Sequence, residues 1–305
     1  MFGQAGSSLT ANPEADMIEE ERGSIEYEEH GSSGATLVLA PGSCSTGAAW
    51  RPVMKALDGK FRFVTTSLLG YGATAERRSE GDPSATHEAE VLEAVIAKAG
   101  GNVHLVGHSF GGAVALVVAM RKRVPIASLT VLEAPVPSLL SHCGETAQYR
   151  AFRDMTDAYF AAWHGGDREA IGTMIDFYGG EGTYASWPER VRAYAVETTP
   201  VNMLDWASAY DEPLSPELLA AIDVPVSVAV GARSHPAICR ANGLVAMSIE
   251  GATYRTIGGA AHFMISTHPA QVAELILANV RVAEAGPASV VAPPAQTEPA
   301  QTCCR

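Results

Sequence analysis

The chain has 305 residues, of which 47% are hydrophobic and 18% are charged, and its net charge at pH 7 is −13. This composition is typical of a globular enzyme whose core fills one large domain, with or without an insertion. The negative charge disfavours nucleic acid and anionic membranes as partners. No apolar run approaches the ~18–20 residues that cross a bilayer. The first residues carry neither the basic nor the apolar part of a secretory signal.

Five cysteines show neither the spacing of metal ligands nor an even disulfide framework. They are Cys44, Cys143, Cys239, Cys303 and Cys304. Such usage is typical of a reducing compartment, so we expect a cytoplasmic protein. The sequence gives no indication of the oligomeric state.

Apolar runs and helical spacings alternate along most of the chain. After a small, polar stretch at 1–16 that predicts a disordered tail, weak alternation from Ile18 to Glu29 predicts a hairpin turned at Gly23-Ser24. The further predicted strands cover 35–40, 61–66, 102–106, 128–133, 224–230 and 254–257, and the predicted helices cover 48–57, 87–99, 112–120 and 268–280. This alternation predicts an α/β fold with a doubly wound, mostly parallel sheet.

Residues 138–220 break the alternation, because they contain helical patterns and no convincing strand. We predict a helical cap inserted between two core segments, 17–137 and 221–284. The cap holds 12 of the 21 aromatic residues of the chain, which suits either an aromatic-lined pocket or ordinary helix packing. Residues 285–305 are rich in proline and alanine and predict a disordered tail.

The pentapeptide Gly107-His108-Ser109-Phe110-Gly111 lies between a predicted strand and a predicted helix. A G-x-S-x-G sequence in this context is typical of a nucleophile elbow, a turn so sharp that side chains would clash two positions before and after the serine, where the glycines stand. Ser109 is therefore the candidate nucleophile. The alternative is a glycine-rich turn without chemistry.

A serine hydroxyl needs a neighbouring base, and the base needs an acid that orients it. In an open α/β sheet these groups follow the carboxyl ends of strands. His262 follows the last predicted strand, and the required order of residues is serine, acid, histidine. His262 is the candidate base, and His235 is the alternative.

With these residues in view, the chain resembles the α/β-hydrolase superfamily from about residue 25 to residue 282. The resemblance rests on 37–43, Leu69-Gly70-Tyr71-Gly72, 107–112, Val230-Gly231 and 259–263. It implies the fold predicted above and an enzyme. Three positions depart from the pattern. Pro41 and Ser67 replace a usual histidine and aspartate, and no aspartate follows Val230-Gly231.

Glu133, at the carboxyl end of the strand after the elbow helix, is the candidate replacement for the missing acid. Some superfamily members, several haloalkane dehalogenases among them, are similar in placing the triad acid there. A buried glutamate needs a partner, and the imidazole of His262 can provide one. Asp205 and Asp211 in the cap are the alternatives.

The resemblance also implies an oxyanion hole formed by backbone N–H groups. By position these belong to Phe110 and to Ser43, and the side chains of Ser43 and Cys44 could line the site.

These residues predict a serine hydrolase that cleaves a small, mostly apolar ester, lactone or thioester through an acyl-enzyme. Two alternatives stay open. One is a C–C hydrolase, lyase or acyltransferase on the same scaffold, and the other is a non-catalytic receptor for a small ligand. The chain has no H-E-x-x-H or G-x-G-x-x-G sequence, so neither a metal nor a nucleotide cofactor is expected.

Overall fold

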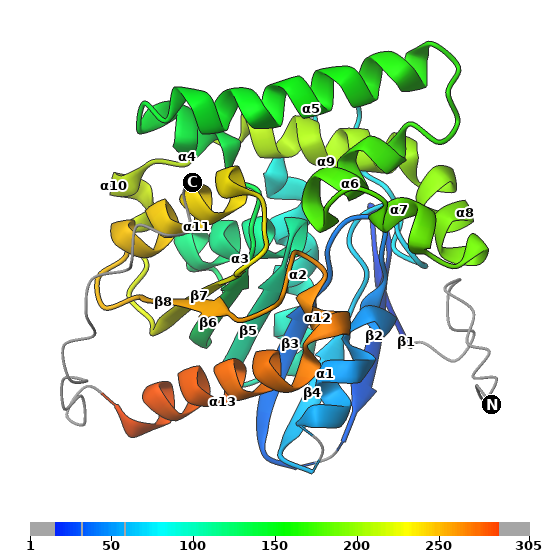
Figure 1. Ribbon diagram of the computed structural model, residues 1–305. Helices are drawn as coiled ribbons and strands as arrows, with labels where there is room; N and C mark the ends of the chain where they lie inside the picture. Colours follow the sequence, from blue (N-terminus) through cyan, green and yellow to red (C-terminus); the bar gives the residue numbers. More distant parts are fainter. Residues whose placement is uncertain (1–15, 32, 58, 287–305) are drawn as a thin grey trace, which may run out of the picture.

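The computed structural model describes residues 16–31, 33–57 and 59–286 (Figure 1). The predicted tails lie outside these ranges, apart from Asp16, which begins the first strand, and residues 285–286, where the last helix ends. In the described part of the chain, no helix has the length and apolar character that crossing a membrane requires.

An eight-stranded sheet forms the centre of the molecule. Its strands are β1 (Asp16–Glu20), β2 (Gly23–His30), β3 (Ala35–Ala40), β4 (Phe61–Thr65), β5 (Val103–His108), β6 (Ile126–Leu132), β7 (Val226–Gly231) and β8 (Thr253–Ile257). They lie in the order β1-β2-β4-β3-β5-β6-β7-β8. Neighbours from β4 to β8 pair in parallel, and β2 pairs antiparallel with both β1 and β4.

Helices cover both faces of this sheet. One face carries α2 (Ala85–Ala99), α3 (Phe110–Arg121) and α11 (Pro236–Ser248), and the other carries η1 (Gly47–Trp50), α1 (Arg51–Ala56), α12 (Met264–Thr267) and α13 (Pro269–Ala285). Val38 and Leu39 of β3 belong to two different buried clusters, because successive side chains of a strand point to opposite faces. The structure confirms the doubly wound α/β class.

The segment between β6 and β7 is helical. It contains α4 (Pro137–His142), α5 (Thr146–His164), α6 (Ile171–Gly179), α7 (Thr183–Ser186), α8 (Glu189–Glu197), α9 (Thr199–Asp211) and α10 (Pro216–Leu219). In Figure 1, α5, α6 and α9 lie across one end of the sheet. Helix α3 is buried almost throughout because it packs against β5, β6, α2 and α9.

One local expectation is wrong, and one long helix is not predicted. Gly23 pairs with Glu20, so the hairpin turns at Glu21-Arg22, two residues before the predicted turn. Gly23 instead permits close packing, because a Cβ there would lie 2.6 Å from the Cβ of Ala75. Helix α11 lies in a segment for which the sequence analysis predicts no element.

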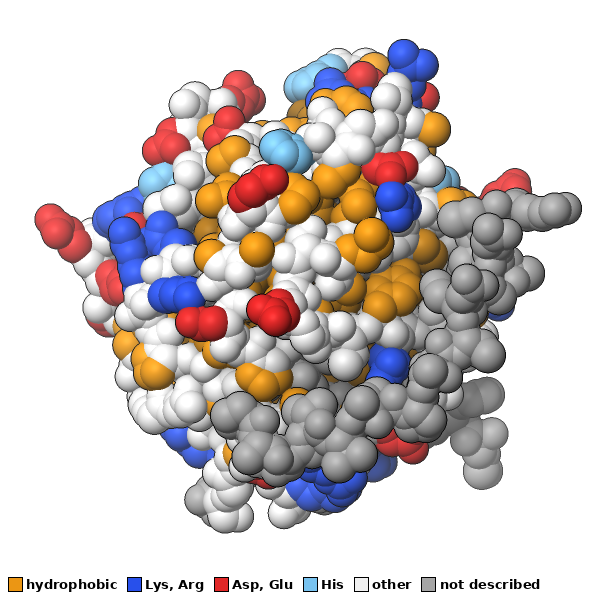
Figure 2. Space-filling view, turned by 90° about the vertical axis from the view of Figure 1, so that its left-hand side faces the viewer, with side chains coloured by type: hydrophobic (Ala, Val, Ile, Leu, Met, Phe, Trp, Pro, Cys, Tyr) orange, Lys and Arg blue, Asp and Glu red, His pale blue; other side chains and the backbone are white. Residues whose placement is uncertain are grey.

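The surface on the side of α11 carries side chains of every kind. Figure 2 shows acidic, basic and hydrophobic groups interspersed over this face. Among the described residues, the exposed large apolar side chains are Leu218, Met247 and Val282. They belong to three different helices, α10, α11 and α13.

Candidate active site

Ser109 stands at the sharp turn between β5 and α3. Its φ and ψ are 54° and −129°, values that few residues other than glycine adopt. Hydrogen bonds hold this turn, since the Ser109 N–H donates to the Leu132 carbonyl oxygen at 2.8 Å. A Cβ at position 111 would lie 2.2 Å from the carbonyl oxygen of Pro41, so only glycine fits there. The turn has the geometry of a nucleophile elbow.

His262 and Glu133 continue a chain of hydrogen bonds from Ser109. The Nε2 atom of His262 lies 2.9 Å from Ser109 Oγ, and its Nδ1 atom lies 2.7 Å from Glu133 Oε2. A carboxylate can only accept, so Nδ1 carries the hydrogen and Nε2 is left to accept from the serine hydroxyl. The exposed fractions of Ser109, His262 and Glu133 are 8%, 3% and 0%. Water is therefore largely excluded from the chain of hydrogen bonds.

Glu133 follows β6 directly, in a left-handed conformation with φ of 52°. Its Oε1 atom accepts from the Gly231 N–H at 2.6 Å and from the Ser234 hydroxyl. Together with His262, the carboxylate has three donors, which offset the cost of burying it. Gly231 ends β7, and Ser234 lies in the loop that follows it, which lacks the usual aspartate. That loop thus contacts the acid instead of supplying it, and the sequence analysis gave Ser234 no such role.

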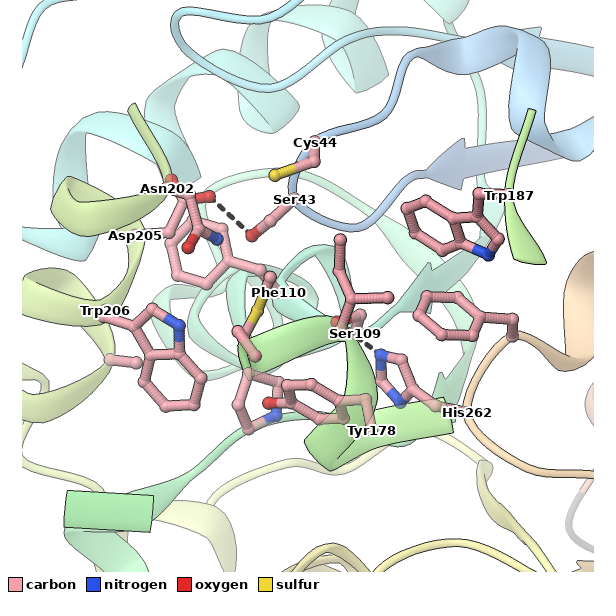
Figure 3. A pocket seen from close by; sticks show the side chains of 15 residues that line it. Ser43, Cys44, Ser109, Phe110, Tyr178, Trp187, Asn202, Asp205, Trp206 and His262 are labelled. Atoms are coloured by element: carbon pink, nitrogen blue, oxygen red, sulfur yellow. Dashed lines mark hydrogen bonds between the residues drawn. The ribbon is translucent and has the colours of Figure 1, made fainter. Parts of the chain in front are cut away.

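A small cavity opens above Ser109 (Figure 3). Its walls include Ser43, Phe110 and His262 from the core, and Met174, Ile175, Tyr178, Trp187, Asn202, Asp205, Trp206 and Ala209 from the cap segment. Its free volume is about 40 Å³, below the roughly 300–1,000 Å³ of pockets that hold drug-sized ligands. The cavity therefore suits a small group.

The two residues expected to form the oxyanion hole line this cavity beside Ser109. Phe110 is the first residue of α3, and amides in the first turn of a helix have no partner within the helix. Ser43 lies in the loop after β3, followed by Cys44 in a left-handed conformation with φ of 54°. The structure brings both residues to the candidate nucleophile.

The sequence profile of the alpha/beta hydrolase family matches residues 37–275, which include Ser109, Glu133 and His262. The chain belongs to this family. A protein named "Putative carbamate hydrolase RutD" from Agrobacterium fabrum is 35% identical over 114 residues, which are 36% of this chain and 43% of that relative. A carbendazim hydrolyzing esterase from Nocardioides is 36% identical over 104 residues, which are 34% and 43% of the two chains. The chain thus spans less than half the length of both curated relatives in these matches.

Solved structures agree with the family assignment. A thermophilic esterase from Thermogutta terrifontis superposes with a TM-score of 0.69 over 88% of this chain and 99% of that one, at 22% identity. A hydrolase from Pseudomonas aeruginosa superposes with a TM-score of 0.70 over 88% and 98%, at 18% identity. At these identities the likeness concerns the fold.

Within this alpha/beta hydrolase, the alternative base and acids have other partners. His235 caps α11, where its Nδ1 accepts from the Ala237 N–H at 3.2 Å, and its ring stacks on Phe177. Asp211 is exposed at the end of α9. Asp205 lines the cavity but is hydrogen-bonded elsewhere, as described below. The structure therefore brings His262 and Glu133, and none of these three, into the chain of hydrogen bonds at Ser109.

His108 has a positional role that the sequence analysis did not predict. Its Nε2–H donates to the carbonyl oxygen of His262 at 2.9 Å, and the two ring centroids lie 4.8 Å apart. Burial, with a contribution from His262, lowers the pKa of His108 to about 3, so its ring is neutral at pH 7. His108 thus holds the backbone of the candidate base without adding a charge beside it. On α6, Tyr178 packs against the His262 ring at 4.1 Å between centroids.

Asp205 of α9 joins the cap segment to the core. Its Oδ2 atom accepts from the Ser43 hydroxyl at 2.5 Å and the Tyr71 hydroxyl at 2.6 Å, and its Oδ1 atom accepts from Arg78 at 2.8 Å. Burial raises the pKa of Asp205, although Arg78 and the two hydroxyls oppose this. Burial also raises the pKa of Glu88, the second buried partner of Arg78, to about 8. Asp205 therefore links the loop after β3, which carries Ser43, to helix α9.

Metal ions require several ligands close together. Among residues 16–31, 33–57 and 59–286, no group of three or more His, Cys, Asp or Glu side chains has such an arrangement. The polar groups at Ser109 satisfy one another instead, through the hydrogen bonds described above.

Proposed function

We propose that this alpha/beta hydrolase is a serine hydrolase that cleaves small, mostly apolar esters, with lactones, thioesters and carbamates as related substrates. The observation that carries the proposal is the chain of hydrogen bonds from Ser109 through His262 to Glu133, under a small and largely apolar cavity. The Agrobacterium relative is named as a carbamate hydrolase, which supports the inclusion of carbamates.

In this proposal, Ser109 Oγ attacks the carbonyl carbon of the ester while His262 Nε2 takes the hydroxyl proton. The amides of Phe110 and Ser43 donate to the oxygen that becomes negative. His262 then returns the proton to the departing alcohol, and an acyl-enzyme remains on Ser109. Water repeats the sequence and releases the acid. Glu133 keeps Nδ1 protonated and stabilises the imidazolium that forms in each step.

The presence of an acid beside His262 favours an enzyme over a non-catalytic receptor. A receptor without turnover would need no acid beside the histidine. The aspartate usual after β7 is missing, but Glu133 makes the corresponding hydrogen bond to His262. We also propose that the reaction takes place in a reducing cytoplasm, because the five cysteines show neither metal-ligand spacing nor an even disulfide framework.

Labelling of the nucleophile tests the proposal directly. A fluorophosphonate probe should modify the wild type at one serine, and Ser109→Ala should abolish labelling. Ser186→Ala is the matched control, because Ser186 is an exposed serine whose hydroxyl donates to the Thr183 carbonyl oxygen. Labelling that persists in Ser109→Ala would remove Ser109 as the nucleophile.

Pre-steady-state kinetics tests the acyl-enzyme. With p-nitrophenyl acetate, butanoate and octanoate, we expect a burst of one nitrophenol per enzyme and a specificity constant that falls with chain length, because the cavity is small. Hydrolysis that proceeds without labelling of Ser109, or acyl transfer to an added alcohol in place of water, would favour the alternatives on the same scaffold.

A further inference from the structure

We propose that Asn202 is a specificity-determining residue that accepts a hydrogen bond from the substrate. The substrate would then be a small ester or carbamate that carries an O–H or N–H group near the reacting carbonyl. This inference rests on the proposed function and narrows its substrate class.

Asn202 and Asp205 are three residues apart on α9, so they lie on the same face of that helix. Both line the cavity above Ser109, and their exposed fractions are 1% and 2%. In Figure 3 they lie together on the side of Ser43 and Cys44, and His262 and Trp187 lie on the other side. The cavity thus has one polar wall among apolar ones.

The two side chains of this polar wall differ in their hydrogen bonding. Asp205 accepts from Ser43, Tyr71 and Arg78, so its carboxylate is already occupied. The Oδ1 atom of Asn202 is buried and has no hydrogen-bond partner among the described residues. A buried amide oxygen without a donor costs free energy, and such groups in folded proteins call for an explanation. A ligand in the cavity would provide the missing donor.

The charge beside Asn202 selects among ligands. The Asp205 carboxylate is adjacent on the same helix face, so a substrate carboxylate would meet a like charge. A hydroxyl or N–H group on the substrate satisfies the Asn202 oxygen, whereas a methyl group in the same place leaves it unpaired. Sites of this kind discriminate by the cost of leaving a buried polar group without a partner. We therefore expect recognition of a donor and rejection of its apolar isostere.

Matched substrates test this inference through the ratio of specificity constants. The p-nitrophenyl esters of 2-hydroxypropanoate and 3-hydroxybutanoate carry a donor at two distances, and those of 2-methylpropanoate and 3-methylbutanoate replace the hydroxyl by methyl. The ester of 3-oxobutanoate carries an acceptor only. We expect one hydroxy ester to exceed its methyl isostere by about tenfold in kcat/KM, and the oxo ester not to share this gain.

Variants at position 202 locate the effect. Asn202→Leu should reduce the hydroxy-to-methyl ratio to about one, whereas Asn202→Asp, which keeps an acceptor, should retain a preference for the hydroxy ester. Met174→Leu, an apolar exchange in the same cavity, should keep the wild-type ratio. A ratio near one in the wild type, or one that Asn202→Leu does not change, would overturn the inference.

Binding to the Ser109→Ala variant separates this inference from the proposed function. Calorimetric titration with ethyl 3-hydroxybutanoate and ethyl 3-methylbutanoate needs no turnover. If no ester is hydrolysed but the hydroxy ester binds more tightly, and Asn202→Leu removes the difference, the proposed function fails. The inference that Asn202 accepts a hydrogen bond from the ligand then still holds. If esters are hydrolysed without this preference in rate or binding, the function stands and the inference fails.

Discussion

Glu133 and Asp205 are two carboxylates buried around one cavity, and each accepts hydrogen bonds from three groups. Glu133 accepts from His262, whose other ring nitrogen contacts Ser109. Asp205 accepts from Arg78, which keeps its proton at any ordinary pH. Only the first carboxylate is connected to a group that can carry a proton to and from a nucleophile. Burial and the number of hydrogen bonds are therefore alike in the two carboxylates. What distinguishes Glu133 as the proposed catalytic acid is its partner, His262.

The largest effect should come from the base that Glu133 contacts. His262→Ala should lower kcat for p-nitrophenyl acetate by at least about 10⁴-fold, close to the effect of Ser109→Ala, because members of a triad act as a unit. His235→Ala serves as the control and should change kcat by less than about threefold. A larger loss in His235→Ala than in His262→Ala would show that the base is His235, in the loop after β7, and that our assignment is wrong.

Exchange of the acid should have the next largest effect. Glu133→Gln keeps the shape of the side chain but can stabilise the other imidazole tautomer, so kcat should fall by about 10²–10⁴-fold. Steady-state kinetics at pH 7 measures this. Ser234→Ala, which removes one donor to the same carboxylate, should lower kcat by only about two- to tenfold.

Asp205→Asn should act mainly on stability. The substitution removes one negatively charged partner of Arg78, but its other partners Glu76 and Glu88 remain. The free energy of unfolding should therefore fall by about 1–3 kcal/mol, which is less than the loss expected when an isolated buried ion pair is broken. Urea denaturation measures this loss. The accompanying fall in kcat should be about tenfold or less. If Asp205→Asn abolished turnover while Glu133→Gln stayed within about threefold of wild type, the acid would come from the cap.

The last prediction concerns pH and His108, which should change stability without changing the chemistry at pH 7. Its pKa is about 3 in the folded chain and near 6.5 when unfolded, so between these values the unfolded chain binds a proton that the folded chain does not. The free energy of unfolding should therefore fall with decreasing pH, by up to about 1.4 kcal/mol per pH unit from this group. His108→Gln keeps a donor for the His262 carbonyl and should make the dependence less steep between pH 4.5 and 6.5. Equal slopes in both proteins, measured by urea denaturation, would contradict this origin.

The sequence predicts the strands well but misses the long helix α11 and the short helix α12. Helix α11 is not predicted because Asn242 interrupts the apolar pattern of its buried face. The structure explains this residue, since its side chain accepts from the Ala134 N–H at 2.9 Å and donates to the Ala134 carbonyl oxygen at 3.0 Å. A polar residue that serves a distant backbone looks, in the sequence, like a residue facing water. The hairpin turn is misplaced for a similar reason, because Gly23 is needed for contact with Ala75.

The sequence by itself determined the fold class and the candidate residues at the strand ends. Local apolar patterns identify strands and helices, and parallel strands bring their carboxyl ends to one edge, where Ser109, Glu133 and His262 meet. Only the tertiary structure decided the contacts of Asp205 and the unpaired oxygen of Asn202. Asp205 and Ser43 are 162 residues apart in the sequence. The spacing of residues along the chain cannot predict which buried polar groups pair across such a distance, because the pairing depends on how α9 packs on the loops of the core.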